Sequence, residues 1–88
     1  MSGIATSNKW FTYVLRSDKD GGLYIGMAMN VEERVKQHNR GYNASTRLRA
    51  PFTLIYSEAY ESSSKARERE KFLKSGKGRE FLKSCTKV

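Results

Sequence analysis

The fold is decided by residues 10–28, which read WFTYVLRSDKDGGLYIGMA. Residues 10–15 are aromatic or β-branched apart from one leucine, as is typical of a strand. Residues 18–22 are Asp-Lys-Asp-Gly-Gly, and the glycines can adopt the positive φ angles that tight turns need. Residues 23–28 again have the composition of a strand, so the stretch predicts an antiparallel hairpin.

Helix signals follow this hairpin. Asn30 can cap the next helix, and Glu33, three residues on, completes a capping-box-like arrangement. Gly41 suits the left-handed position directly after the last turn, so we expect the helix to end just before it. Residues 42–51 then predict a polar, basic loop, and residues 52–59 predict a third strand.

The last third of the chain has the pattern of two helices. The serines at positions 62–64 offer an N-cap for a second helix, which we expect to end at Ser75, before Gly76. Residues 79–84 predict a short third helix.

The element order β-β-α-β-α-α contains no internal repeat and predicts one α+β domain. Three strands alone would leave a face of the sheet in water, so we expect a small three-stranded antiparallel sheet flanked by helices. A length of 88 residues suffices for one domain. We expect a disordered leader at residues 1–9, the domain at residues 10–84 and a frayed tail at residues 85–88.

The charge of the chain predicts an anionic partner. Lys and Arg number 17 against 9 acidic residues, which makes the net charge +8 and the pI about 9.9. The excess is regional, because five basic residues and no acidic one lie between Glu33 and Glu58. A surface that serves solubility would explain the net charge, but a regional excess favours nucleic acid. We expect DNA rather than RNA, with a protein partner or a homodimer left open.

Other features of the sequence exclude several classes of protein. No apolar run approaches the ~20 residues of a membrane span, and residues 1–8 lack the apolar segment of a signal peptide. Cys85 is the single cysteine, which excludes an internal disulfide and a cysteine-based zinc site. We therefore expect a cytoplasmic protein without membrane contact.

Polar residues occupy helix positions where apolar ones would pack. On the first helix Arg34 and His38 share the stripe of two valines, because the four stand at i, i+3, i+4 and i+7. On the second helix Glu70 shares the stripe of Ala66 and Leu73, whereas Glu68 points away. An unpaired carboxylate at such a border is costly, so Glu70 needs a cationic partner or a metal.

Each of these residues also has a purely structural explanation. Arg34 and Glu70 can form a partly buried ion pair, and His38 can be a hydrogen-bonded residue at the core edge. Tyr13 and Tyr24, one in each strand of the hairpin, can be core aromatics with solvated hydroxyls. Three polar residues from two helices of a basic chain favour a shared site instead. The sequence has no P-loop, dinucleotide motif or catalytic triad order, so these residue types suit phosphodiester cleavage.

Four segments in this order resemble the GIY-YIG nuclease family. Tyr24-Ile25-Gly26 matches the second signature, and Phe11-Thr12-Tyr13 keeps the tyrosine of the first. Residues 30–41 resemble the family's helix, in which a histidine follows an arginine by four residues. Ser45-Thr46-Arg47 with Ala50-Pro51 resembles the loop of the short single-domain bacterial members, and residues 69–76 resemble their C-terminal motif. The resemblance covers residues 10–83, with one departure at Ala28, where Ser or Thr is common.

The resemblance implies hydrolysis of a phosphodiester bond with one divalent cation. Carried over by position, Glu70 would hold Mg²⁺ (or Mn²⁺) and Arg34 would stabilise the phosphate. Tyr13, Tyr24 and His38 would surround the attacking water. Because a signature tyrosine is favoured, we expect Tyr13 to be the general base, with a pKa lowered by Arg34 and the cation. His38 is the rival base, with a pKa that the same charges push down.

Backbone phosphates are expected to contact Arg47, Arg49 and Lys74. The first two lie in the acid-free loop, and the third follows Glu70 by one turn. The expected function is a metal-dependent endonuclease that cuts structured or damaged DNA. The alternative is a nucleic-acid-binding module that does not cleave, or a subunit that needs a partner for recognition.

Overall fold

The structure is a computed structural model that describes residues 9–44 and 46–85. Its elements, in chain order, are β1 (Trp10–Ser17), β2 (Leu23–Ala28), α1 (Val31–Asn39), the 3-10 helix η2 (Arg47–Arg49), β3 (Phe52–Tyr60), α2 (Ser63–Lys74) and α3 (Gly76–Cys85). This order confirms the predicted β-β-α-β-α-α arrangement. Residues 1–8 of the predicted leader (1–9) and residues 86–88 of the predicted tail (85–88) lie outside the described residues. Cys85, assigned to the tail from the sequence, is instead the last residue of α3.

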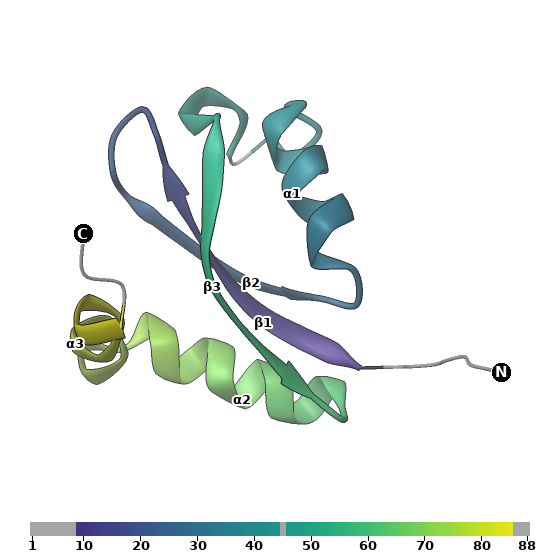
Figure 1. Cartoon of the computed structure of the whole chain (residues 1–88), viewed down its shortest axis with the longest axis vertical. Helices are drawn as coiled ribbons and strands as arrows, with labels where there is room; N and C mark the ends of the chain where they lie inside the picture. Colours follow the sequence, from purple (N-terminus) through teal and green to yellow (C-terminus); the bar gives the residue numbers. More distant parts are fainter. Residues whose placement is uncertain (1–8, 45, 86–88) are drawn as a thin grey trace, which may run out of the picture.

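The sheet is antiparallel throughout, with the strand order β2-β1-β3. The central strand β1 pairs with both neighbours, and its pairing with β2 places Tyr13 opposite Gly26. Figure 1 shows the twisted sheet with α1 on one side and with α2 and α3 on the other. Helices therefore cover both faces of a sheet that is too small to be stable alone.

Two core clusters result, one on each face of β1. Tyr13 and Leu15 lie on the side of α1. Val14, between them, packs on the opposite side against Leu73 of α2 and Leu82 of α3. All five side chains are at most 1% exposed. Successive side chains of a strand point to opposite faces, so β1 is the common centre of both clusters.

Capping groups define α1 as predicted. Asn30 accepts a hydrogen bond from a backbone N–H of the first turn at 3.0 Å, which caps the N-terminus. At the other end Gly41 has φ +81°, and its N–H donates to the His38 carbonyl. The Tyr42 N–H donates to the Gln37 carbonyl. These two bonds make a Schellman motif, so α1 ends sharply and the chain leaves it at Tyr42.

The third helix begins at Gly76, three residues before its predicted start. Ser75 serves both helices, because its hydroxyl donates to the Phe72 carbonyl and accepts from the Gly78 N–H. A Cβ on Gly78 would lie 2.0 Å from the Phe72 carbonyl oxygen, so a glycine is needed for α3 to pack this closely on α2. Ser62 caps the start of α2, as predicted.

The helices are short. The 3-10 helix η2 lies inside the predicted loop and has no counterpart in the prediction, because three residues carry no periodic signal. The longest helix among the described residues is α2, with 12 residues. None of the described helices combines the length and apolar character that crossing a membrane requires.

Candidate active site

Two tyrosines from neighbouring strands meet beside a glycine. Tyr13 of β1 and Tyr24 of β2 have ring centroids 6.4 Å apart. Gly26 leaves the space for them, since a Cβ there would lie 2.8 Å from the Tyr13 hydroxyl oxygen and 3.2 Å from the Tyr24 ring. Any side chain at this position would therefore push the two phenols apart.

α1 places His38 against this pair. Its Nε2 is 3.3 Å from the Tyr13 hydroxyl oxygen, and its ring centroid is 4.7 Å from that of Tyr24. His38 and Tyr13 are each 1% exposed, whereas Tyr24 is half-buried. The predicted packing of His38 against the core is confirmed, and the three rings form one cluster.

Thr46, from the loop after α1, completes the surroundings of His38. Its Oγ1 lies 2.8 Å from His38 Nδ1 and donates to the Asn43 carbonyl at 3.4 Å. With the threonine proton on that carbonyl, the hydroxyl oxygen can accept from Nδ1–H. We therefore assign the proton of His38 to Nδ1, which leaves Nε2 to accept the proton of the Tyr13 hydroxyl.

Burial shifts the pKa values of both partners. Desolvation raises the pKa of Tyr13 above its ordinary 10.0, although a hydrogen bond from Arg34 acts in the opposite direction. The sequence predicts that Arg34 and a bound cation together lower the pKa of Tyr13; without a cation, the effect of burial on this pKa is larger than that of Arg34. Desolvation and, after it, the charge of Arg34 lower the pKa of His38 below 6.5, as predicted. At neutral pH, Tyr13 is therefore a neutral phenol beside a neutral imidazole.

Arg34 lies on the rim of this cluster. Its side chain is exposed and lines a hollow of about 270 Å³ together with His38. The guanidinium donates to the Gln37 side chain at 3.4 Å. The arginine therefore lies within reach of a ligand in this hollow.

Glu70 approaches the cluster from α2. Its carboxylate is 20% exposed and forms an ion pair with Lys74 at 3.1 Å. The structural explanation from the sequence names Arg34 as the partner of Glu70, whereas the structure gives it Lys74, one turn along the same helix. Glu70 and Tyr24 line a second hollow, of about 350 Å³. The negative charge of Glu70 also contributes to the raised pKa of Tyr13.

Glu70 is the carboxylate that a metal ion at this site would have to use. In residues 9–44 and 46–85, no group of three or more His, Cys, Asp and Glu side chains could hold a metal ion. One carboxylate completed by water and phosphate oxygens is the way in which Mg²⁺ is commonly bound. The donor set therefore fits Mg²⁺, and it does not fit a closed zinc site.

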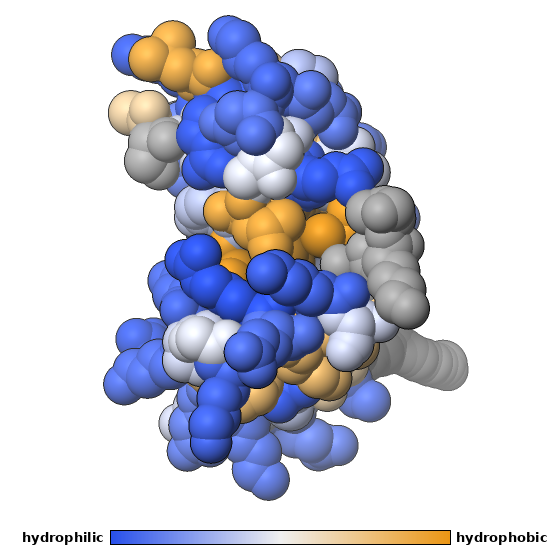
Figure 2. Space-filling model, turned by 90° about the vertical axis from the view of Figure 1, so that its left-hand side faces the viewer, coloured by the Kyte–Doolittle hydropathy of each residue, from blue (hydrophilic) through white to orange (hydrophobic). Residues whose placement is uncertain are grey.

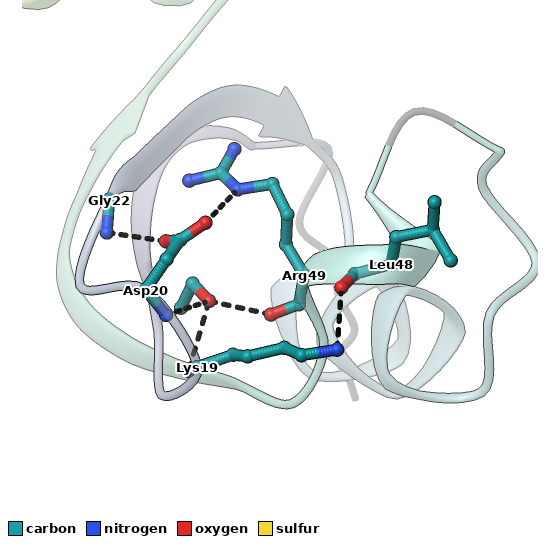
Figure 3. Close-up of polar contacts among 6 residues, drawn as sticks. Lys19, Asp20, Gly22, Leu48 and Arg49 are labelled. Carbon is teal, nitrogen blue, oxygen red and sulfur yellow. Dashed lines mark hydrogen bonds and ion pairs between the residues drawn. The ribbon is translucent and has the colours of Figure 1, made fainter.

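The three residues predicted to bind phosphate have different surroundings. Arg47 is exposed, whereas Lys74 is engaged by Glu70. The Arg49 Nε donates to a carboxylate oxygen of Asp20 at 3.1 Å, and Figure 3 shows this ion pair beside the turn between β1 and β2. The loop itself contains no acidic residue, but folding places Asp20 of the hairpin turn against Arg49 of the loop.

The same turn anchors the loop. The Ser17 hydroxyl donates to the Arg49 carbonyl at 2.6 Å. The Lys19 ammonium donates to the Leu48 carbonyl at 3.2 Å (Figure 3). The backbone of η2 is therefore fixed to the hairpin, while the side chains of Arg47 and Leu48 remain exposed.

Most of the visible surface is hydrophilic, as the composition predicts. Figure 2 shows hydrophilic residues over the upper and lower parts of one face, with hydrophobic surface gathered between them. The exposed large hydrophobic residues of the described chain include Leu23, Met29, Tyr42, Leu48 and Leu54. Tyr42 and Leu48 stand out at 71% and 79% exposure, and both belong to the loop between α1 and β3.

This arrangement of strands, helices and clustered residues matches a known family. A family model described as the GIY-YIG catalytic domain matches residues 9–83. The chain belongs to the GIY-YIG family. The match includes both strands of the hairpin, α1 and α2, so the clustered tyrosines, Arg34, His38 and Glu70 all lie inside the catalytic domain.

GIY-YIG relatives of this chain include small bacterial proteins. The UPF0213 proteins of Staphylococcus aureus strains Mu50 and N315 are each 46% identical over 61 residues, which is 68% of this chain and 73% of theirs. The solution NMR structure of the UPF0213 protein BH0048 from Bacillus halodurans is 35% identical, with a TM-score of 0.52. The likeness covers 86% of this chain and 83% of that one. These names state no activity, so the expectation of nuclease activity rests on the match to the GIY-YIG catalytic domain.

The structure adds residues to the site that no sequence pattern assigns. Thr46 belongs to a segment that resembles the family's loop. Its contact with His38 could not be predicted from sequence spacing, because an irregular turn separates the two residues. Gly26 belongs to the second signature, but its role as the space between two rings depends on the register of the strands. Arg79 of α3 lines the hollow that contains Glu70 and adds a basic group there.

Proposed function

We propose that this GIY-YIG chain is a metal-dependent endonuclease that hydrolyses phosphodiester bonds in structured or damaged DNA. The observation that carries the proposal is the buried contact between Tyr13 and His38, with Arg34 beside it in one hollow and Glu70 in the next. Phosphodiester hydrolysis requires cationic groups for the developing charge and an acceptor for the proton of water. The clustered side chains include groups of both kinds.

Glu70 would hold the divalent cation, Mg²⁺ or Mn²⁺, which supplies Lewis-acid polarisation of the phosphate and acidification of water. The carboxylate first has to give up its ion pair with Lys74. That exchange costs little, because the Lys74 side chain is 55% exposed and ion pairs of this kind contribute about 0–1 kcal/mol. Lys74 is then available for the backbone phosphate predicted as its ligand.

Arg34 would bind the phosphate that is cut. Its exposed guanidinium is held by a 3.4 Å hydrogen bond to Gln37, so it can turn toward an anion in the hollow. The Tyr13 residue is 1% exposed in the free protein, so this role of Arg34 is proposed together with entry of the attacking water at the phenol when the substrate binds.

Tyr13 would act as the general base, with His38 as the next proton acceptor. The unprotonated Nε2 of His38 is 3.3 Å from the Tyr13 hydroxyl oxygen. Because burial raises the pKa of Tyr13, the phenol would take the proton of water while it gives its own proton to Nε2. Tyr24 is half-buried in the hollow that contains Glu70 and would orient the water or the phosphate.

A nucleic-acid-binding module that does not cleave is the second candidate. The burial of Tyr13 favours it, because a residue that is 1% exposed offers its hydroxyl little contact with water in the free protein. A subunit that needs a protein partner, or a homodimer, would have the same site and little activity alone. Under either candidate we propose DNA rather than RNA as the ligand, and a cytoplasmic location.

Metal-dependent nicking decides between the two candidates. The purified chain is incubated with labelled branched, single-stranded and duplex DNA in Mg²⁺, in Mn²⁺ and in EDTA. Glu70→Gln should abolish cleavage and leave folding and DNA affinity near the parental values. Glu68→Gln, on the exposed face of the same helix, is the matched control and should cut like the parent. Parental activity in both variants would place the metal elsewhere, and a parent that binds but never cuts would establish the binding module.

A further inference from the structure

Tyr42 occupies a position at the end of α1 where a side chain usually packs. It follows Gly41, and its N–H makes one of the two hydrogen bonds of the Schellman motif. In this motif, the residue at that position frequently contacts an apolar residue in the last turn of the helix. The corresponding residues of α1 are Gln37 and Lys36, which are polar. The Tyr42 ring has no apolar partner there, and the residue is 71% exposed.

The exposed ring borders the hollow that contains Arg34. Residues 34, 37, 38 and 42–44 line this hollow, and none of them is acidic. His38, at its inner end, contacts Tyr13. Arg40, two residues before Tyr42, is also exposed. An aromatic face therefore stands at the edge of a basic hollow, next to the residues proposed for catalysis.

An aromatic face beside a basic hollow matches the way in which proteins bind single-stranded nucleic acid. The cations bind the backbone, and successive bases stack on aromatic rings. In a duplex each base face is covered by its neighbours, so a ring can stack only on a base that has left the helix. We propose that Tyr42 stacks on an unpaired base of the DNA strand whose phosphate Arg34 binds. This inference rests on the proposed function and narrows its substrate to DNA with unpaired nucleotides at the cut.

Binding measured without cleavage tests the inference separately from the nuclease activity. Fluorescence anisotropy in EDTA gives the affinity of the chain for a labelled oligothymidylate and for a duplex of the same length. Tyr42→Ala should weaken single-strand binding by roughly 5- to 150-fold and leave duplex binding unchanged, since one stacked base is lost. Tyr42→Phe keeps the ring and should bind like the parent.

Leu48→Ala is the matched control, because Leu48 is 79% exposed on the same loop and has no aromatic face. It should change neither affinity. Tyr42→Ala should also unfold at the parental temperature, since its ring is exposed. A 2-aminopurine base in the single strand reports stacking directly, and its fluorescence should be quenched by the parent and by Tyr42→Phe but not by Tyr42→Ala.

Two results would overturn the inference. The first is a Tyr42→Ala variant that binds single-stranded DNA with parental affinity. The second is a Tyr42→Ala variant that loses affinity equally for single-stranded and duplex DNA, which would show that Tyr42 contacts the backbone. If the parental chain binds neither the single strand nor the duplex, both the inference and the proposed function are wrong. If the parent binds and does not cut, the nuclease proposal fails, and the same anisotropy data still decide whether Tyr42 stacks.

Discussion

Removal of the Tyr13 hydroxyl tests the chemistry of the site most directly. Tyr13→Phe deletes one oxygen from a residue that is 1% exposed and leaves its ring in the core cluster. The lost hydrogen bond to His38 is 3.3 Å long, which is beyond the usual range and indicates a weak bond. We expect a loss of about 1 kcal/mol in the free energy of unfolding. For a domain of this size, that lowers Tm by ~4–8 °C, so the variant stays folded at 25 °C.

The effect of Tyr13→Phe on cleavage should be much larger than its effect on stability. Loss of a general base costs about 10²–10⁴ in rate. DNA affinity should stay parental, because the proposed contact with the phosphate is made by Arg34 and not by the buried hydroxyl. Single-turnover rates from pH 6 to 9 at saturating Mg²⁺ measure the chemical step, and anisotropy in EDTA measures binding. His38→Ala should lower the rate less, because it removes the second proton acceptor and keeps the first.

The assignment of the base is refuted by either of two outcomes. If Tyr13→Phe keeps a near-parental rate while His38→Ala is inactive, the histidine is the base. If Tyr24→Phe is inactive while Tyr13→Phe is not, the base is the half-buried tyrosine that lines the hollow with Glu70. A weaker DNA affinity in Tyr13→Phe would show instead that the hydroxyl binds the substrate.

Two further predictions concern charge. In a plot of log DNA affinity against log salt concentration, Arg47→Gln should reduce the steepness of the slope by roughly 0.7–0.9. The reduction should be similar for all base sequences. Arg49→Gln should reduce the slope less, because Asp20 already neutralises that guanidinium; a loss confined to one base sequence would reveal base reading. The second prediction follows from His38, whose pKa is lowered in the folded state, so the unfolded chain takes up a proton first as pH falls. Stability should therefore be complete above pH 6.5 and decline as pH falls through the lowered pKa, by at most ~1.4 kcal/mol per pH unit. Urea unfolding across this range should show the decline in the parent and not in His38→Gln, and an equal decline in both would assign it to another group.

The elements of the fold follow from local sequence. The hairpin at residues 10–28 and the caps Asn30, Gly41 and Ser62 are confirmed, because turn and capping preferences act over a few residues. The predicted start of α3 is wrong by three residues, because Gly76 and Gly78 disfavour a helix by their local preference. In the folded chain, the absence of a side chain at Gly78 allows the contact with α2, and that gain outweighs the preference.

The residues of the candidate site could also be predicted only in part from local sequence. Periodicity on two helices was enough to select Arg34, His38 and Glu70 as residues with a common location. It did not identify the ion-pair partners, because Glu70 pairs with a residue one turn along its own helix, whereas Arg49 pairs with a residue 29 positions away in the sequence. The pairing of Glu70 with Lys74, and of Arg49 with Asp20, is known only from the structure.

By itself, the sequence determined the α+β class, the order of the elements, the basic character of the loop after α1 and the residue types of the site. The tertiary structure decided the protonation of the site. Only the packed chain buries Tyr13 and His38 together and places Thr46 on Nδ1. Desolvation depends on the atoms that surround a group after folding, and it overrides the effect of the neighbouring arginine on the pKa of Tyr13.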